Sequence, residues 1–121
     1  MSGGSWEYVA AYRSGTYGSS GFDATTIAPY LNKYIDVYNA SSRETTYNYR
    51  ILGDATGEMG PFSSNHVISW YGDYTYFINS TAPWFFRGGD YGNTTNAGQF
   101  YFGRNTGAAF SGYSARVVFA P

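Results

Sequence analysis

The sequence predicts an α+β domain with short antiparallel strands, one or two short helices and extensive ordered loops. Runs of aromatic and β-branched residues bounded by Gly predict the strands, and one stretch with helical spacing predicts a helix. The 16 glycines between these runs indicate ordered turns. Aromatic residues make up 21% of the chain, which argues against disorder. A chain of 121 residues buries one core, so we expect residues 1–121 to form a single domain.

The first elements follow from local composition. Residues 5–12, SWEYVAAY, are apolar enough for a strand or a short helical turn, and a Gly/Ser loop follows at 13–22. Asp23 is suited to cap a helix, because its carboxylate can accept from the free N–H groups of a first turn. Pro29 should not lie inside that helix, so we expect the helix near 28–36.

The remaining strands are expected in the second half of the chain. Residues 39–50 are polar and irregular, and residues 50–62 contain three glycines, which indicate turns around one short strand. Strand-like segments rich in aromatic or β-branched residues are 66–78, 83–87, 98–104 and 114–120. The start Met1-Ser2-Gly3-Gly4, directly before a structured segment, suggests that the chain is the carboxy-terminal part of a longer protein.

Large apolar side chains in a small domain are buried by default. We therefore expect a core that contains Trp6, Trp70, Trp84, Phe85, Phe86, Phe102, Val117 and Phe119. Arg87 and Arg116 lie among these apolar residues, where a guanidinium is suited to bridge loop carbonyls or an acidic group. We expect both arginines to be structural.

Charge and composition exclude several classes of partner. The net charge is −1 and no basic stripe is present, so nucleic acid is not expected. No apolar run approaches the roughly 20 residues of a membrane helix, so this chain is not expected to insert into a membrane. Cysteine is absent and His66 is the only histidine, which excludes thiol nucleophiles, disulfides and multi-histidine metal centres. The sequence leaves the oligomeric state open.

Three landmarks occur in order along the chain: GGSWEY (3–8), WFFRGGDY (84–91) with NAGQFYF (96–102), and SARVVFA (114–120). They resemble the Gly-Asn-Val-Trp-Glu-Trp, Arg-Gly-Gly-Ser-Trp and Gly-Phe-Arg-Val landmarks of the formylglycine-generating-enzyme, or sulfatase-modifying-factor, family. That family is a branch of the C-type-lectin-like fold. The resemblance is closest to bacterial and phage surface proteins, including variable proteins diversified by retroelements.

The resemblance implies a C-type-lectin-like fold and a location that is extracellular, on the cell surface or on a phage particle. Two departures are visible. Residues 13–82 stand between the first two landmarks as an insertion, and Ser114-Ala115-Arg116 stands where Gly-Phe-Arg is usual. Formylglycine generation, as the resemblance implies, needs cysteines near the closing strand. This chain has none, so we expect no enzyme and no catalytic residues.

Carboxylates are the remaining candidates for chemistry. Asp54, Glu58, Asp73 and Asp90 could pair as in glycosidases, although we expect turn capping or solvation instead. The Trp-Glu landmark contributes to a calcium site in the enzyme family, so Glu7 could join Asp54 and Glu58 as an oxygen ligand. The alternative for Glu7 is to accept backbone N–H bonds. We predict no required cofactor and leave calcium open.

Residues 90–114 carry the predicted recognition surface. If the landmark strands form the scaffold, the residues between them face outward at turns and on alternate strand positions. Their types resemble those of antibody-like binding surfaces, in which Tyr supplies contact area and Asn and Ser supply adaptable hydrogen bonds. In retroelement-diversified relatives, variable positions occupy this interval. The predicted ligand-binding residues are Asp90, Tyr91, Asn93, Thr94, Tyr101, Gly103, Arg104, Asn105, Phe110, Ser111, Tyr113 and Ser114.

These observations predict a non-enzymatic, receptor- or adhesin-type domain. Its partner would be a protein or glycan ligand on a cell or phage surface. Two alternatives stay open: a carbohydrate-binding module, in which Trp or Tyr stacks on sugar rings, and a degenerate enzyme of the sulfatase-modifying type.

Overall fold

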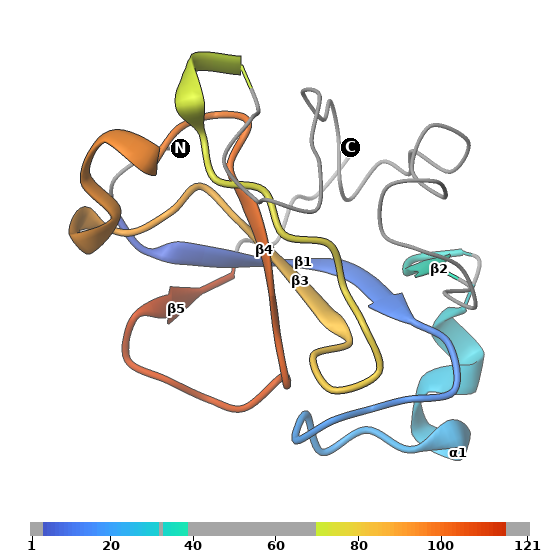
Figure 1. Ribbon diagram of the computed structural model, residues 1–121. Helices are drawn as coiled ribbons and strands as arrows, with labels where there is room; N and C mark the ends of the chain where they lie inside the picture. The colour runs from blue at the N-terminus through green and yellow to red at the C-terminus, as the bar shows by residue number, and fades with distance from the viewer. Residues whose placement is uncertain (1–3, 32, 39–69, 116–121) are drawn as a thin grey trace, which may run out of the picture.

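A computed structural model describes residues 4–31, 33–38 and 70–115 (Figure 1). Within these ranges the chain forms a mixed five-stranded sheet and a few short helices, which confirms the expected α+β class. The strands are β1 (Trp6–Arg13), β2 (Asp36–Tyr38), β3 (Trp84–Arg87), β4 (Phe102–Asn105) and β5 (Tyr113–Ser114). None of the helices among the described residues is long and apolar enough to cross a membrane.

The sheet is built around β1. Its order is β2-β1-β3-β4, and β5 pairs with the first residues of β1. The β1–β3 and β3–β4 pairs are antiparallel, as expected, but β2 and β5 both run parallel to β1. The prediction of antiparallel strands is wrong for these two pairs. Parallel pairing needs a long crossover, and residues 14–35 supply one between β1 and β2.

The helices are α1 (Ala24–Ile27) and three 3₁₀ helices: η1 (Ala28–Tyr30), η2 (Trp70–Gly72) and η3 (Tyr91–Asn96). The predicted cap at Asp23 is confirmed. Its Oδ1 accepts from the N–H groups of Thr25 at 2.9 Å and Thr26 at 2.8 Å. The Thr26 hydroxyl accepts in return from the Asp23 N–H at 2.9 Å, which completes a capping box.

The predicted helix at 28–36 is wrong, because the helical segment covers residues 24–30. Pro29 lies in the first turn of η1, where a backbone N–H has no partner within the helix. The N–H that proline lacks therefore costs no hydrogen bond. The Asp23 cap therefore starts the helix ahead of the proline. Leu31 then adopts an extended backbone with ψ of 140°, which ends the helical segment.

Side chains alternate between the two faces of the sheet and form two clusters. On the face that Phe85 occupies, the buried residues are Ala11, Tyr38, Phe77, Ile78, Phe85 and Phe102. On the opposite face, which we call the Trp84 face, Tyr12, Ile27 and Trp84 are buried. Ile27 of α1 joins this second cluster, and α1 and η3 lie at opposite ends of the sheet (Figure 1). The helix α1 therefore covers only the part of the Trp84 face around Tyr12 and Trp84, and the rest of that face can make other contacts.

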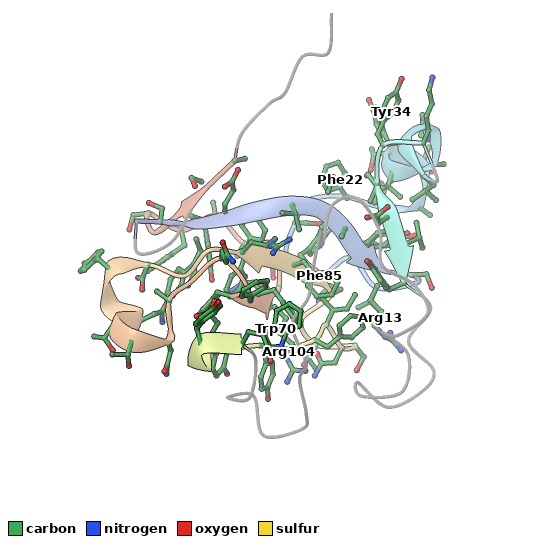
Figure 2. All side chains as sticks on the ribbon, turned by 90° about the horizontal axis from the view of Figure 1, so that it is seen from above. Arg13, Phe22, Tyr34, Trp70, Phe85 and Arg104 are labelled. Carbon is green, nitrogen blue, oxygen red and sulfur yellow. The ribbon has the colours of Figure 1, made fainter. Side chains whose placement is uncertain are left out.

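The core prediction is confirmed for Trp84, Phe85, Phe86 and Phe102, which are all buried. It is wrong for Trp70, which is 51% exposed. The helix η2 holds the Trp70 indole at the surface, edge-on to the Phe100 ring at 4.9 Å (Figure 2). Trp6 is only half-buried. Arg116, Val117 and Phe119 lie outside the described residues.

The strand predictions are confirmed in part. Residues 83–87 contain β3, but only the end of 98–104 is a strand. Ahead of β4, the Asp73 carboxylate accepts from the Phe100 N–H at 2.8 Å, and the Tyr101 N–H bonds the Gly98 carbonyl, so a turn forms there. The described part of 66–78 holds η2 and an isolated bridge between Thr75 and Phe102. The predictions for 39–50, 50–62 and most of 114–120 lie outside the described residues.

Candidate ligand-binding surface

A continuous row of aromatic rings crosses the Trp84 face. Consecutive ring centroids along it lie 5.3–6.2 Å apart, within the range of favourable aromatic pairs. In spatial order the members of this aromatic row are Tyr76, Tyr74, Tyr101, Phe86, Trp6, Tyr113 and Phe110. The strand register brings rings of the row together. Phe86 of β3 lies between Tyr8 of β1 and Gly103 of β4, and Trp6 of β1 lies opposite Tyr113 of β5.

Residues 74–76 extend the row beyond β4. The Tyr76 N–H donates to the Phe102 carbonyl at 2.9 Å, and the Phe102 N–H donates to the Tyr74 carbonyl at 3.2 Å. Thr75 is buried opposite Phe102, so alternation places Tyr74 and Tyr76 on the other side, with Tyr101. The two tyrosine rings are parallel to within 2°.

The first pocket on this face, the Arg104 pocket, has a volume of about 450 Å³. The Arg104 guanidinium lies 3.6 Å above the centroid of the Tyr76 ring, and its Nη1 donates to the Phe77 carbonyl at 2.8 Å. Both contacts fix the orientation of the cation. The pocket is lined by Tyr74, Tyr76, Ala82, Phe86, Asn93, Asn96, Tyr101, Gly103 and Arg104.

The second pocket, the Phe110 pocket, has a volume of about 400 Å³ and is lined by Trp6, Asn105, Thr106, Ala108, Ala109, Phe110 and Tyr113. Hydrogen bonds join two of its lining residues, Asn105 and Tyr113, to each other and to Tyr8. Asn105 Nδ2 donates to the Tyr113 hydroxyl at 2.6 Å, and the Tyr8 hydroxyl donates to Asn105 Oδ1 at 3.0 Å. Burial raises the pKa of Tyr8 to about 12, with a further contribution from Tyr113.

The helix η3 borders the Arg104 pocket and is anchored to β1. Asp90 Oδ1 accepts from the Gly92 N–H at 3.0 Å and caps the helix. Asn93 Oδ1 accepts from the Asp90 N–H at 2.8 Å and from Trp6 Nε1 at 2.9 Å. Thr94 has φ of 48°, which is unfavourable for a β-branched residue. The polar side chains of η3 thus have structural roles as well as exposed positions.

The predicted site residues differ in exposure. Tyr91 is 84% exposed and Phe110 60% exposed, and Thr94 and Ser111 are also exposed, as expected. Six predicted residues are partly buried: Asp90, Asn93, Arg104, Asn105, Tyr113 and Ser114. Ser114 Oγ donates to the Trp6 carbonyl at 3.1 Å, which joins β5 to β1.

The prediction that Tyr101 and Gly103 face outward is wrong, because both are buried. Tyr101 is 3% exposed, since its ring packs against Tyr74 and Phe86. A Cβ atom at Gly103 would lie 2.5 Å from the Phe86 ring. Glycine is therefore needed here so that the Phe86 ring can pack closely against the backbone of β4. Burial raises the pKa of Tyr101 to about 12.

Tyr74, Tyr76 and Asn96 of the Arg104 pocket lie outside the predicted set. Trp6, which was expected in the core, lines the Phe110 pocket. A signal for the two tyrosines was present. In the run DYTYF (73–77), alternate positions carry Tyr, and an extended segment places such residues on one face. Nothing local to this run indicated that it lies against β4.

The carboxylates have structural roles where they are described. Asp90 caps η3 and Asp73 accepts from a backbone N–H, as the turn-capping interpretation predicts. Glu7 lies opposite Arg87 in the β1–β3 pair, and Arg87 Nη2 donates to the Gln99 carbonyl at 2.9 Å, so Arg87 is structural as expected. Asp54, Glu58 and His66 lie outside the described ranges. Within those ranges no three His, Asp or Glu residues are grouped as metal ligands.

Comparison of the chain with models of protein families, with curated proteins and with solved structures finds no match.

Alkaline pH provides a test of the buried tyrosines. The pKa values of Tyr8 and Tyr101 are raised from 10.0 to about 12 in the folded protein. Below pH 10 both groups are protonated in the folded and unfolded states, so their contribution to stability is complete. Above pH 10 the unfolded state loses these protons first, so we expect the free energy of unfolding to fall as pH rises to about 12.

The measurement is urea unfolding at a series of pH values, with the Tyr101→Phe variant alongside. Because Phe cannot ionise, the variant should lose less stability than the wild type across this interval. An identical pH dependence for the two proteins would contradict the burial of the Tyr101 hydroxyl.

Proposed function

We propose that this chain is a non-enzymatic ligand-binding domain and that the aromatic row with its two pockets is its recognition surface. The observation that carries the proposal is the continuity of the row: aromatic rings from three strands and three loops form one surface that opens into both pockets. Clusters of aromatic residues with exposed members mark interaction sites, and such residues supply most of the energy of binding.

The surface binds by complementarity and involves no covalent step. Phe86 and Tyr101 are buried and rigid, and they position the partly exposed Trp6, Tyr74 and Tyr113 around them. Phe110, at the end of the row, is 60% exposed although its ring packs against Tyr113, and Tyr91 of η3 is 84% exposed. A rigid centre with an exposed margin reduces the conformational entropy lost on binding.

The C-type-lectin-like fold, of the type found in the formylglycine-generating-enzyme family, belongs to the same proposal. The support for this fold is that residues of the three landmarks pair with one another in the sheet. Glu7 of the first landmark pairs with Arg87 of the second, and Ser114 of the third pairs with Glu7 from the other edge of β1. The proposal includes an extracellular, cell-surface or phage-particle location, and diversification of residues 90–114, which contribute to both pockets.

The test compares two double variants, each of which replaces two exposed aromatic residues by Ser. In the first, Tyr91→Ser and Phe110→Ser remove two exposed aromatic rings, one from η3, which borders the Arg104 pocket, and one from the end of the row. In the second, Tyr30→Ser and Tyr34→Ser remove exposed rings near α1, where Tyr34 lies on the opposite side of β1 from Arg104 (Figure 2). Tyr34 and Phe110 are both 60% exposed, Tyr30 is 48% exposed and Tyr91 84% exposed, so each variant removes two exposed rings. Tyr101 is left unchanged because it is buried.

The probe is fluorescently labelled domain applied to a panel of intact bacterial cells and to a glycan array. We expect saturable binding that the first variant weakens by at least about tenfold, while the second variant binds as the wild type does. Circular dichroism should show both variants folded, since exposed substitutions change stability by about 0.5 kcal/mol or less. Equal binding by the two variants would remove the aromatic row from the proposed function.

A further inference from the structure

The Phe110 pocket lies where the chain leaves β4 and returns to the sheet as β5. Its volume of about 400 Å³ falls within the range of small-molecule pockets. The strand β4 ends at Asn105, β5 begins at Tyr113, and residues 106–112 connect them (Figure 1). Asn105, Tyr113 and Trp6, the first residue of β1, all line the pocket. A ligand there would therefore contact one terminal residue from each of three strands.

Three aromatic side chains of this lining pack against one another at different angles. The Trp6 centroid lies 5.3 Å from that of Tyr113 and 6.5 Å from that of Phe110. The Phe110 and Tyr113 rings are tilted by 63°, and Phe110 is 60% exposed, so much of its ring is available to a ligand. The face of an aromatic ring carries partial negative charge and attracts polarised C–H groups. One face of a sugar ring consists of such C–H groups, so it can pack against these rings.

Hydrogen bonds and close packing hold the rings in place before a ligand binds. Trp6 Nε1 donates to Asn93 Oδ1 at 2.9 Å, and the Trp6 N–H donates to the Gly112 carbonyl at 3.0 Å. A Cβ atom at Gly112 would lie 3.0 Å from the Phe110 ring and 3.4 Å from the Trp6 ring, so glycine permits this packing. A site that is ordered in advance loses less conformational entropy on binding.

The Tyr113 hydroxyl supplies a hydrogen-bond donor. The Gly107 N–H donates to Asn105 Oδ1 at 3.2 Å, and this bond sets the orientation of the amide because a backbone N–H can only donate. Asn105 Nδ2 therefore donates to the Tyr113 oxygen, at 2.6 Å. No group among the described residues accepts the proton of the Tyr113 hydroxyl. This proton is thus available to an oxygen atom of a ligand.

Thr106 supplies the complementary acceptor. Its Oγ1 donates to Asn105 Oδ1 at 3.3 Å, and a hydroxyl oxygen that donates keeps lone pairs with which it can accept. Sugar hydroxyls both donate and accept, so they can use Thr106 and Tyr113, whereas an apolar side chain of a peptide can use neither. The combination of ring faces with a donor and an acceptor therefore fits a saccharide better than an apolar side chain.

We propose that the Phe110 pocket binds a saccharide, whose C–H face packs against the aromatic rings and one of whose hydroxyl oxygens accepts from the Tyr113 hydroxyl. The inference rests on the proposed binding function and adds the chemical class of the ligand and the part of the surface that holds it. Phe110 supplies area for packing and Tyr113 supplies the directional bond, so the two contributions can be removed separately.

The experiment uses saturation-transfer-difference NMR with methyl glycosides of hexoses and of N-acetylhexosamines. N-acetylphenylalanine amide is included as a model of an apolar peptide side chain. We expect at least one glycoside to bind. Its strongest signals should come from the C–H protons on one face of the sugar, because that face lies against the aromatic rings.

Two protein variants locate the effect. Tyr113→Phe keeps the ring and removes the hydroxyl, and Phe110→Ala removes an exposed ring, so each should weaken binding of that glycoside by roughly tenfold. The control is Tyr34→Phe, which removes a hydroxyl from a 60% exposed residue that is not part of the described lining. It should bind as the wild type does.

A series of monodeoxy derivatives of the bound glycoside tests the same hydrogen bond with the protein unchanged. The derivative that lacks the accepting hydroxyl should bind roughly tenfold more weakly than the parent. The inference is overturned if no glycoside binds, if only the phenylalanine amide binds, or if all deoxy derivatives bind as the parent does. Binding to cells that depends on Tyr91 and Phe110 would then still support the proposed function, so the two failures are distinguishable.

Discussion

The Phe85→Ala variant is expected to lose about 3–5 kcal/mol of unfolding free energy, because a buried ring is removed and a cavity remains. Phe85 is completely buried on the face of the sheet opposite the aromatic row. Its ring packs edge-on against Phe77 at 4.9 Å, Tyr38 at 5.4 Å and Phe102 at 6.0 Å. These contacts join β2, β3, β4 and residues 73–82, so no neighbour can easily move into the cavity.

The measurement is urea unfolding followed by circular dichroism. The Tyr34→Ala variant is the control, because Tyr34 is 60% exposed and should change stability by about 0.5 kcal/mol or less. A loss of less than about 1 kcal/mol for Phe85→Ala would mean that Phe85 is not the centre of this cluster.

The Gly18→Ala variant is expected to lose about 2–5 kcal/mol, the sum of a backbone and a packing effect. Gly18 has φ of 59°, a left-handed conformation that costs other residues roughly 1–2 kcal/mol. A Cβ at this position would also collide with the Thr106 carbonyl. That carbonyl accepts from the Ser19 N–H at 2.6 Å and joins the loop after β1 to the end of β4.

Gly15→Ala separates the two effects. Gly15 also has positive φ, at 77°, but a Cβ there meets no atom within 4 Å. It should therefore lose only the backbone contribution of about 1–2 kcal/mol. If Gly18→Ala and Gly15→Ala have the same unfolding free energy, the close approach of Gly18 to Thr106 does not stabilise the fold.

The structure divides residues 90–114 into two groups with different tolerance to change. Tyr101 and Gly103 are packed against Phe86 and belong to the scaffold. Tyr91, Phe110 and Ser111 are exposed, and of these Phe110 lines the Phe110 pocket. A binding domain can therefore change its ligand at these exposed positions while the buried centre of the aromatic row keeps its geometry.

The predictions that the structure confirms depend on neighbours in the sequence. Asp23 caps a helix because Thr25 and Thr26 are within reach of its carboxylate, and this pattern can be read directly. The strand at 83–87 follows from a run of large aromatic residues between Pro83 and Gly88. The expected helix at 28–36 is wrong because the Asp23 cap starts the helical segment earlier and Pro29 fits in the first turn of η1.

The sequence by itself determined the α+β class, the helix cap at Asp23, the strand β3 and the burial of Phe85 and Phe102, because composition and short spacings specify these features. Tertiary structure alone decided the parallel pairing of β2 and β5 and the burial of Tyr101 and Gly103. It also decided the aromatic row, in which Tyr74 meets Tyr101 and Trp6 meets Tyr113. The physical reason is that these contacts join residues far apart in the chain, where no local spacing records which strand becomes the neighbour of which.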